Sequence, residues 1–288
     1  MTVMKEKYYS EEQYTLPIRA DFHVHSTYSG DAEASMESMI LKGIDLGLET
    51  ICFTDHQDID FPYDEKTPVG TFDLNTDSYL YELLGLREKY KDKIKVMFGV
   101  EIGMQPHLRR ELALYAKAYD FDFIIGSVHL LNKEDPYYPK VASKYASDEE
   151  LYRAYFKEAF EDFRVFDNFD VFGHLDYIVR YGLTKDRDYS YDKYKDLIDP
   201  LLEKLIDKEK GLEVNTGALA YNLKDLNPCR DILLQYRKMG GELVTIGSDA
   251  HSTDNLGRGF DLAAQALTDC GFKYYCTYEK RVAEFHKI

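Results

Sequence analysis

Residues 20–25 read ADFHVH, a short and mostly apolar run that carries two histidines near its end. Seven further runs of similar character follow, at residues 50–54, 95–101, 121–129, 170–174, 211–215, 243–249 and 272–277. Each run is short and bounded by glycine or polar residues. Most lack strict alternation of apolar and polar positions, which is typical of strands buried on both faces. We therefore expect these runs to form a parallel sheet.

Longer segments between these runs carry apolar residues at three- and four-residue intervals, the pattern of helices packed on a core. The clearest segments cover residues 36–44, 151–163 and 194–206. Ser147, with Glu150 three residues later, forms a capping box that predicts the start of a helix. Alternating strands and helices predict a parallel sheet with right-handed crossovers. Seven or eight such units favour a closed α/β barrel over an open sheet, and no GxGxxG or GxxxxGK(S/T) motif supports a nucleotide-binding open sheet.

The size and charge of the chain limit the classes of protein it can belong to. Its 288 residues, 44% of them hydrophobic, contain no repeat or linker, so we expect a single barrel domain over residues 1–288. With 36 basic and 52 acidic residues, the net charge is −16. This charge disfavours nucleic acid and anionic membranes as partners, because both are negatively charged.

The sequence carries no signal for membrane insertion or secretion. No apolar run approaches the length needed to span a bilayer, and residues 1–14 are too polar for a signal peptide. The four cysteines show no CxxC spacing, which argues against a disulfide framework. We therefore expect a cytoplasmic protein.

The histidines are placed in an unusual way. Six of the eight lie at the end of a predicted strand or within two residues after it, and Glu101 and Asp249 occupy equivalent positions. In a parallel barrel these strand ends meet at one rim, so residues far apart in sequence come together there. With Asp31 included, the candidate metal ligands are His23, His25, Asp31, His56, Glu101, His129, His174, Asp249 and His251.

Each of these motifs alone also fits a core histidine or a capping pair, but the combination is hard to explain as packing. Buried imidazoles and carboxylates without partners are costly. Imidazole and carboxylate without thiolate suit zinc, iron or manganese. Because one ion takes three or four protein ligands, nine candidates predict at least two ions and leave room for a third, with Glu101 as a bridge.

The sequence motifs around the candidate ligands resemble those of the PHP (polymerase and histidinol phosphatase) family, and within it those of the histidinol-phosphate phosphatase branch. The matching motifs are DFHVHS at 21–26, TDH at 54–56, GVEIG at 99–103, GSVH at 126–129, FGHLD at 172–176 and GSDAH at 247–251. The resemblance covers residues 19–277. It implies a distorted seven-stranded (β/α) barrel with three divalent metal ions that hydrolyses a small phosphomonoester. The expected reaction is hydrolysis of L-histidinol phosphate in histidine biosynthesis, and another small phosphomonoester or a nucleotide is the alternative.

The same resemblance distributes the ligands over three ions. It assigns His23, His25, Glu101 and Asp249 to the first ion, Glu101, His129 and His174 to the second, and Asp31, His56 and His251 to the third. Some relatives carry histidine where this chain has Asp31, so the third position is where this chain departs from the family pattern.

Two arginines are candidates for binding the phosphate group, because a guanidinium forms bidentate, charge-assisted bonds to phosphate. Arg180, six residues after His174, is the first candidate, and Arg258 is the second. Asp249 or His251 is expected to assist proton transfer to the leaving alcohol.

The acidic segment at residues 57–77 lacks periodicity, which is typical of an active-site loop. From its charge we expect Asp58 and Asp60 to receive the ammonium and imidazole of histidinol phosphate. Replacing both by asparagine should then raise KM for this substrate and spare a neutral arylphosphate.

Three other functions compete with this interpretation. A nucleotide-directed phosphoesterase of the same family is compatible with the charge if its substrate is small. An amidohydrolase barrel also opens with HxH, but such enzymes usually bridge their metals through a modified lysine, and no lysine lies at a predicted strand end here. A non-catalytic module stabilised by metal is disfavoured by the full ligand set.

Overall fold

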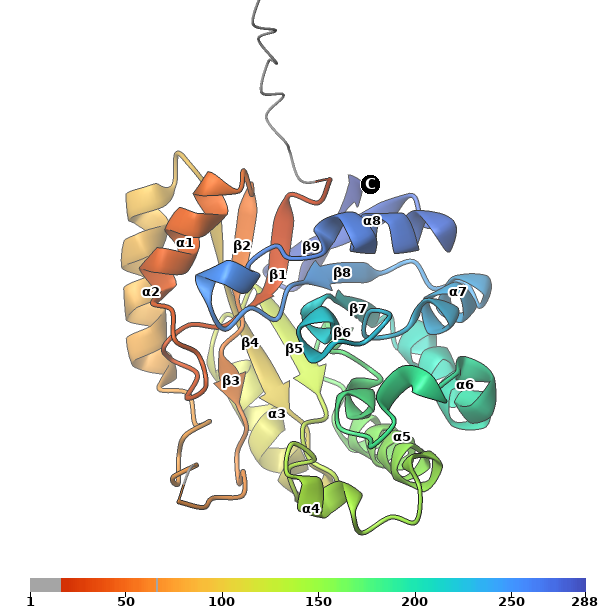
Figure 1. Ribbon diagram of the computed structural model, residues 1–288. Helices are drawn as coiled ribbons and strands as arrows, with labels where there is room; N and C mark the ends of the chain where they lie inside the picture. Colours follow the sequence, from red (N-terminus) through yellow and green to blue (C-terminus); the bar gives the residue numbers. More distant parts are fainter. Residues whose placement is uncertain (1–16, 66) are drawn as a thin grey trace, which may run out of the picture.

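The computed structural model describes residues 17–65 and 67–288, so the predicted absence of a signal peptide concerns a segment outside the described residues. A parallel sheet curves into a barrel at the centre of the molecule (Figure 1). Its strands are β1 (Ala20–Val24), β2 (Thr50–Phe53), β3 (His56–Gln57), β4 (Lys95–Gly103), β5 (Phe123–Ser127), β6 (Val171–Phe172), β7 (Gly211–Asn215) and β8 (Val244–Gly247). Their order is β1-β2-β4-β5-β6-β7-β8, and the short β3 pairs with β4 beyond the end of β2. The predicted α/β barrel with seven strand positions is confirmed.

The first and last barrel strands meet at their C-terminal ends. The amide of His25 donates to the carbonyl of Ala250 at 3.0 Å, and the amide of Asp249 donates to the carbonyl of His23 at 2.8 Å. A Cβ at Gly247 would lie 2.2 Å from the Cβ of His23, so the strands can approach this closely only because residue 247 is glycine. The closure brings His23 and His25, the first predicted ligands in the sequence, close to Asp249 and His251, the last ones.

Helices surround the sheet (Figure 1). They are α1 (Met36–Asp45), α2 (Thr76–Tyr90), α3 (Arg109–Ala118), α4 (Pro139–Ala142), α5 (Asp148–Val165), α6 (Tyr191–Asp207), α7 (Arg230–Lys238) and α8 (Phe260–Asp269). The 3₁₀ turns are η1 (Pro106–Leu108), η2 (Tyr177–Arg180), η3 (Lys185–Arg187), η4 (Gly217–Tyr221) and η5 (Thr253–Asn255). Ser147 caps α5 as predicted, because its hydroxyl accepts from the Glu150 amide at 3.2 Å. The Glu150 carboxylate reaches back to the Ala146 amide at 2.9 Å, one residue before the cap, so the capping box is present only in this modified form.

The run at residues 272–277 is a strand, but the expectation that it belongs to the parallel sheet was wrong. Strand β9 (Tyr274–Glu279) instead pairs antiparallel with β10 (Val282–Lys287) in a separate two-stranded sheet. Lys280 and Arg281 join them with φ angles of 50° and 66°, as in a tight hairpin turn. A short apolar run does not reveal the direction of its partner strand, and β10, with the sequence VAEFHK, is too mixed in polarity to stand out as a strand.

Apolar side chains fill the space inside the barrel and between the sheet and its helices. For example, the buried rings of Phe22 and Phe123 pack edge to face, with centroids 5.2 Å apart. All four cysteines are free, in agreement with the predicted lack of a disulfide framework. In residues 17–65 and 67–288, no helix combines the length and apolarity needed to cross a membrane.

Candidate metal centre

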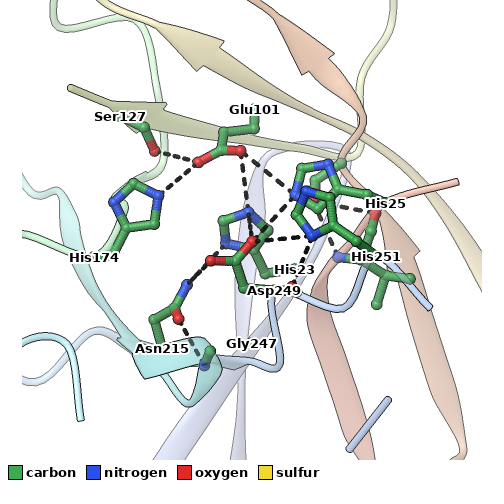
Figure 2. A network of polar contacts seen from close by, with 12 residues as sticks. His23, His25, Glu101, Ser127, His174, Asn215, Gly247, Asp249 and His251 are labelled. Atoms are coloured by element: carbon green, nitrogen blue, oxygen red, sulfur yellow. Dashed lines mark hydrogen bonds and ion pairs between the residues drawn. The ribbon is translucent and has the colours of Figure 1, made fainter. Parts of the chain in front are cut away.

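The nine side chains predicted as metal ligands meet at the C-terminal rim of the barrel, although their sequence positions range from 23 to 251. His23 lies on β1, His56 on β3 and Glu101 on β4, and the others follow closely after β1, β5, β6 and β8. Figure 2 shows Glu101 and Asp249 facing one another across the imidazoles of His23 and His25. The barrel geometry therefore collects these side chains as predicted, and their role as ligands stays a prediction.

Glu101 lies at the centre of this cluster and is fully buried. Its Oε1 lies 3.1 Å from Nε2 of His129 and 3.0 Å from Nε2 of His174. Its Oε2 lies 3.1 Å from Nε2 of His23 and 3.5 Å from Nε2 of His25. One carboxylate thus reaches two pairs of imidazoles through separate oxygens, which is the arrangement expected of a bridging ligand.

Asp249 faces the same two imidazoles as Glu101 from the other side. Its Oδ1 lies 3.7 Å from Nε2 of His23 and 3.5 Å from Nε2 of His25. These four residues form the group that the family resemblance assigns to a first ion.

Asp31 closes the cluster on its solvent side. Its Oδ2 lies 3.2 Å from Nε2 of His251 and 3.8 Å from Nε2 of His56, and its side chain is 45% exposed. These three residues match the group assigned to a third ion, and its carboxylate is the most exposed of the nine predicted ligands.

The cluster leaves buried polar atoms without partners, which tests whether metal ions fit it. Five atoms of the cluster make no hydrogen bond of acceptable geometry within the described residues, although some lie within ion-pair distance of one another: His23 Nε2, His25 Nε2, His56 Nδ1, Glu101 Oε2 and His174 Nδ1. Buried polar atoms are nearly always satisfied, so these atoms require a ligand from outside the chain. Three groups each place their donor atoms within 4.8 Å of one another: His23, His25 and Glu101; His25, His56 and His251; and His56, Glu101 and His129. Nitrogen and carboxylate donors at this spacing fit divalent metal ions.

Further carboxylates behind the cluster orient its imidazoles. Asp58 is buried and accepts from Nδ1 of His129 at 2.8 Å, while Glu213 accepts from Nδ1 of His23 at 2.5 Å. Each bond fixes the tautomer that turns Nε2 toward the centre, as is common for metal-bound histidines. Sequence reasoning did not assign these roles to Asp58 and Glu213.

Sequence signals for these two residues did exist. Asp58 is two residues after His56, and residues at that spacing in a strand point to the same side. Glu213 interrupts the apolar run of β7, where an unpaired carboxylate inside the barrel would be costly. A charged residue in the middle of a buried strand is therefore a usable indicator of a ligand-orienting role.

The electrostatics of the cluster determine which of its groups are charged before a metal ion binds. The surrounding carboxylates outweigh burial and raise the pKa values of His23, His56, His129 and His251. Burial acts to raise the pKa of Glu101, but the imidazoles of His23 and His129 outweigh it and hold that pKa well below its usual range. Burial, with the neighbouring His251 and His56, holds the pKa of His25 well below its usual value. A metal ion binds an ionised carboxylate and a neutral imidazole, so Glu101 and His25 are already in the forms that bind, whereas ligation by His23 or His129 would release a proton.

Two residues of the cluster have backbone conformations that are rare outside glycine. The φ angle is 54° at Asp249 and 20° at His174. Such conformations cost of order 1–3 kcal/mol and concentrate at functional sites, where the surrounding structure enforces them. Both residues follow the end of a barrel strand, where the turn points their side chains into the cluster.

Arg180 lies beside the cluster and is 4% exposed. Its Nε donates to Asn227 at 2.9 Å, one terminal nitrogen donates to Asn215 at 2.9 Å, and the other donates to Oδ2 of Asp249 at 3.1 Å. Its guanidinium also lies 4.9 Å from the ring centroid of Tyr221. The predicted phosphate-binding arginine is thus held rigidly next to a predicted ligand, and its contact with phosphate stays a prediction.

Arg258 is less firmly placed. It is exposed and donates to Oδ1 of Asn255 at 3.3 Å. It lines the same cavity as Arg180, so both candidates face the space above the cluster.

The cavity above the cluster has a volume of about 470 Å³. His56, His129, His174, Asp249 and His251 form one part of its wall. The loop after β3 contributes Asp58, Phe61 and Phe72, so the predicted role of this segment in forming the site agrees with its position. The cavity is the size of a small-molecule site.

Asp60, expected to bind the substrate, does not line this cavity. Its carboxylate accepts from Nε2 of His107 at 2.8 Å and is 61% exposed. Asp58 does line the cavity, but its bond to His129 makes it part of the support for the cluster. The expectation that these two residues receive the substrate cation therefore needs correction, because loop charge alone does not show where each carboxylate points.

The barrel, the rim of imidazoles and carboxylates and the cavity above them define a metal-dependent hydrolase of the (β/α) class. The PHP domain model matches residues 21–217, and the chain belongs to this family.

Relatives and solved structures are similar over nearly the full length. The histidinol-phosphatase of Lactococcus lactis is 32% identical over 260 residues, covering 90% of this chain and 94% of that protein. A probable histidinol-phosphatase of Clostridium acetobutylicum is 33% identical, covering 92% of this chain and 98% of that protein. The crystal structure of the L. lactis histidinol phosphate phosphatase, complexed with zinc, L-histidinol and phosphate, superposes with a TM-score of 0.85 at 30% identity, covering 92% of this chain and 98% of that chain.

Proposed function

We propose that this chain hydrolyses L-histidinol phosphate to L-histidinol and inorganic phosphate, as a metal-dependent phosphomonoesterase of histidine biosynthesis. The observation that carries the proposal is the convergence of Glu101 and eight other imidazole and carboxylate side chains at one rim, under a cavity that Arg180 also lines. The L. lactis relative supports the substrate, because its structure holds L-histidinol and phosphate.

The proposed cofactors are three divalent ions, held as the family resemblance assigns them. The first ion is bound by His23, His25, Glu101 and Asp249, the second by Glu101, His129 and His174, and the third by Asp31, His56 and His251. Zinc, iron and manganese all suit these donors, and the zinc in the L. lactis structure favours zinc. Bound divalent ions supply positive charge that stabilises phosphate and activates water for hydrolysis.

Arg180 is proposed to bind the phosphate group directly. A guanidinium has five N–H donors, and its contacts with Asn227, Asn215 and Asp249 use three of them. The two remaining N–H groups can donate to phosphate oxygens without breaking the contacts that hold the side chain. Arg258, at the edge of the cavity, is proposed as a second contact for the substrate.

Asp249 and His251 are the proposed residues for proton transfer to the leaving alcohol. His251 donates through Nδ1 to the carbonyl of Asp249 at 2.9 Å, so the two residues are coupled at the cavity wall.

Comparing substrates tests the function. Protein reconstituted with zinc or manganese is incubated with L-histidinol phosphate, nucleoside monophosphates, p-nitrophenyl phosphate and a panel of amides, and kcat/KM is measured for each. We expect the highest kcat/KM for L-histidinol phosphate and no amide cleavage. A preference for a nucleotide or an amide would contradict the proposal. In the described residues no lysine lines the cavity, which argues against a lysine-bridged amidohydrolase site.

A further inference from the structure

The cavity wall beyond the metal centre is aromatic. The ring of His174 stacks on Tyr177 with centroids 4.7 Å apart, and Tyr177 contacts Tyr181 at 5.0 Å. Tyr181 in turn lies 6.3 Å from Tyr137. A continuous row of rings therefore leads from the predicted ligands toward the opening, and all four residues line the cavity.

One carboxylate on this wall has no role in the metal cluster. Of the carboxylates that line the cavity, Asp31, Asp58 and Asp249 contact the imidazoles of the cluster, and Asp135 does not. Asp135 accepts through Oδ1 from the amide of Tyr137 at 2.8 Å. No basic side chain of residues 17–65 and 67–288 lies within ion-pair distance of it.

The surroundings of Asp135 favour the arrival of a cation. Burial raises the pKa of this carboxyl group, and the Tyr137 amide and His129 offset this effect only in part. Asp135 and Tyr177 line the same cavity. A ligand cation placed between them would neutralise the carboxylate and lie against the ring faces.

We propose that Asp135 and the tyrosine row formed by Tyr177, Tyr181 and Tyr137 bind the cationic end of the phosphomonoester. The inference rests on the proposed function, since L-histidinol phosphate carries an ammonium on its central carbon and an imidazole at the end opposite its phosphate. With the phosphate at the metal centre, the rest of the molecule extends along the row of rings. Asp135 then takes the role that the sequence suggested for Asp58 and Asp60.

The test compares three variants on two substrates. Asp135→Asn removes the charge but keeps an oxygen that can accept from the Tyr137 amide. Asp60→Asn is the matched control, because this carboxylate belongs to the same acidic surface but lies outside the cavity. The substrates are L-histidinol phosphate and p-nitrophenyl phosphate, which has no cation. Asp135→Glu, which restores the charge, is measured alongside.

We expect Asp135→Asn to raise KM for L-histidinol phosphate by roughly 10- to 100-fold, the usual effect of losing one charge-assisted contact. Its kinetics on p-nitrophenyl phosphate should stay within about twofold of the wild type, and Asp135→Glu should recover part of the lost affinity. Equal losses on both substrates, or an effect of Asp60→Asn as large as that of Asp135→Asn, would overturn the subsite.

A second measurement separates this inference from the proposed function. L-Histidinol should inhibit hydrolysis of p-nitrophenyl phosphate by the wild type, and its inhibition constant should rise in Asp135→Asn. If the wild type hydrolyses L-histidinol phosphate but the wild type and Asp135→Asn bind L-histidinol equally well, only the subsite is wrong. If the wild type neither hydrolyses the phosphate ester nor binds the alcohol, both proposals are wrong.

Discussion

Replacing Glu213 by glutamine is expected to weaken metal binding, although Glu213 is not among the nine predicted ligands. Its carboxylate is 1% exposed. It accepts from Nδ1 of His23 at 2.5 Å and from the amide of His174 at 2.7 Å. Glutamine keeps the size and one acceptor oxygen but removes the charge, so the change acts on the strength and direction of the bond to His23.

The expected size of the effect follows from these contacts. A hydrogen bond to a charged acceptor contributes about 1.5–3 kcal/mol, and a neutral one about 0.5–1.5 kcal/mol. Losing the charge therefore costs about 1–1.5 kcal/mol at His23, which corresponds to roughly a tenfold change in affinity. Because the same carboxylate also holds His174, we expect metal binding to weaken by about 10- to 100-fold, the range typical of residues that orient metal-bound histidines.

Competition with a chromophoric chelator measures this affinity directly. Thermal unfolding of the metal-free proteins shows whether the variant is folded. Glu203→Gln, at an exposed position of α6, is the control for removing one negative charge. A folded Glu213→Gln protein whose metal affinity stays within about twofold of the wild type would refute the argument that this carboxylate supports the cluster.

Three further changes test other parts of the site and fold. His129→Ala should lower turnover at least about 100-fold while the metal-free protein stays folded by circular dichroism, and surviving activity would show that the second ion is misassigned. Arg180→Lys should lose most of the activity that Arg180→Ala loses, because an ammonium cannot reproduce the planar contacts to Asn227 and Asp249, and near-normal kcat/KM in the lysine variant would contradict a bidentate role. Burial, with Glu158 nearby, raises the pKa of Asp162 to about 9, so the folded state keeps a proton that the unfolded chain releases above about pH 4. Stability should therefore fall as pH rises from about 4 to 9, and Asp162→Asn should raise the free energy of unfolding at pH 8 by a few kcal/mol in denaturant titrations, with a gain that shrinks toward pH 4. A gain in the free energy of unfolding that is equal at pH 8 and pH 4 would show that Asp162 does not titrate in this range.

The fold and the convergence of the nine side chains could be predicted because both depend on the ends of strands. In a parallel barrel, any residue just after a strand faces the same rim, so His23, Glu101 and Asp249 could be brought together without knowing the distances between them. The antiparallel hairpin of β9 and β10 could not be predicted in this way. The direction in which a strand pairs is set by its partner, and the mixed polarity of β10 concealed that partner.

The roles of the surrounding carboxylates were harder to predict, because they depend on which way each side chain points. Asp58 and Asp60 are two residues apart, yet one bonds to His129 inside the site and the other to His107 outside it. The positive φ of 62° at Asp60 turns the backbone between them, and nothing in the loop sequence specifies this turn. Asp135 shows the reverse case, since no sequence pattern singles it out and yet it lines the cavity.

Phosphate release from L-histidinol phosphate by the metal-free protein, before and after divalent ions are restored, tests the metal centre most directly. The buried atoms without partners on His23, His25 and Glu101 predict that chelation abolishes turnover and that zinc, manganese or iron restores it. Turnover that continues undiminished in protein shown by elemental analysis to be free of metal would contradict the central claim.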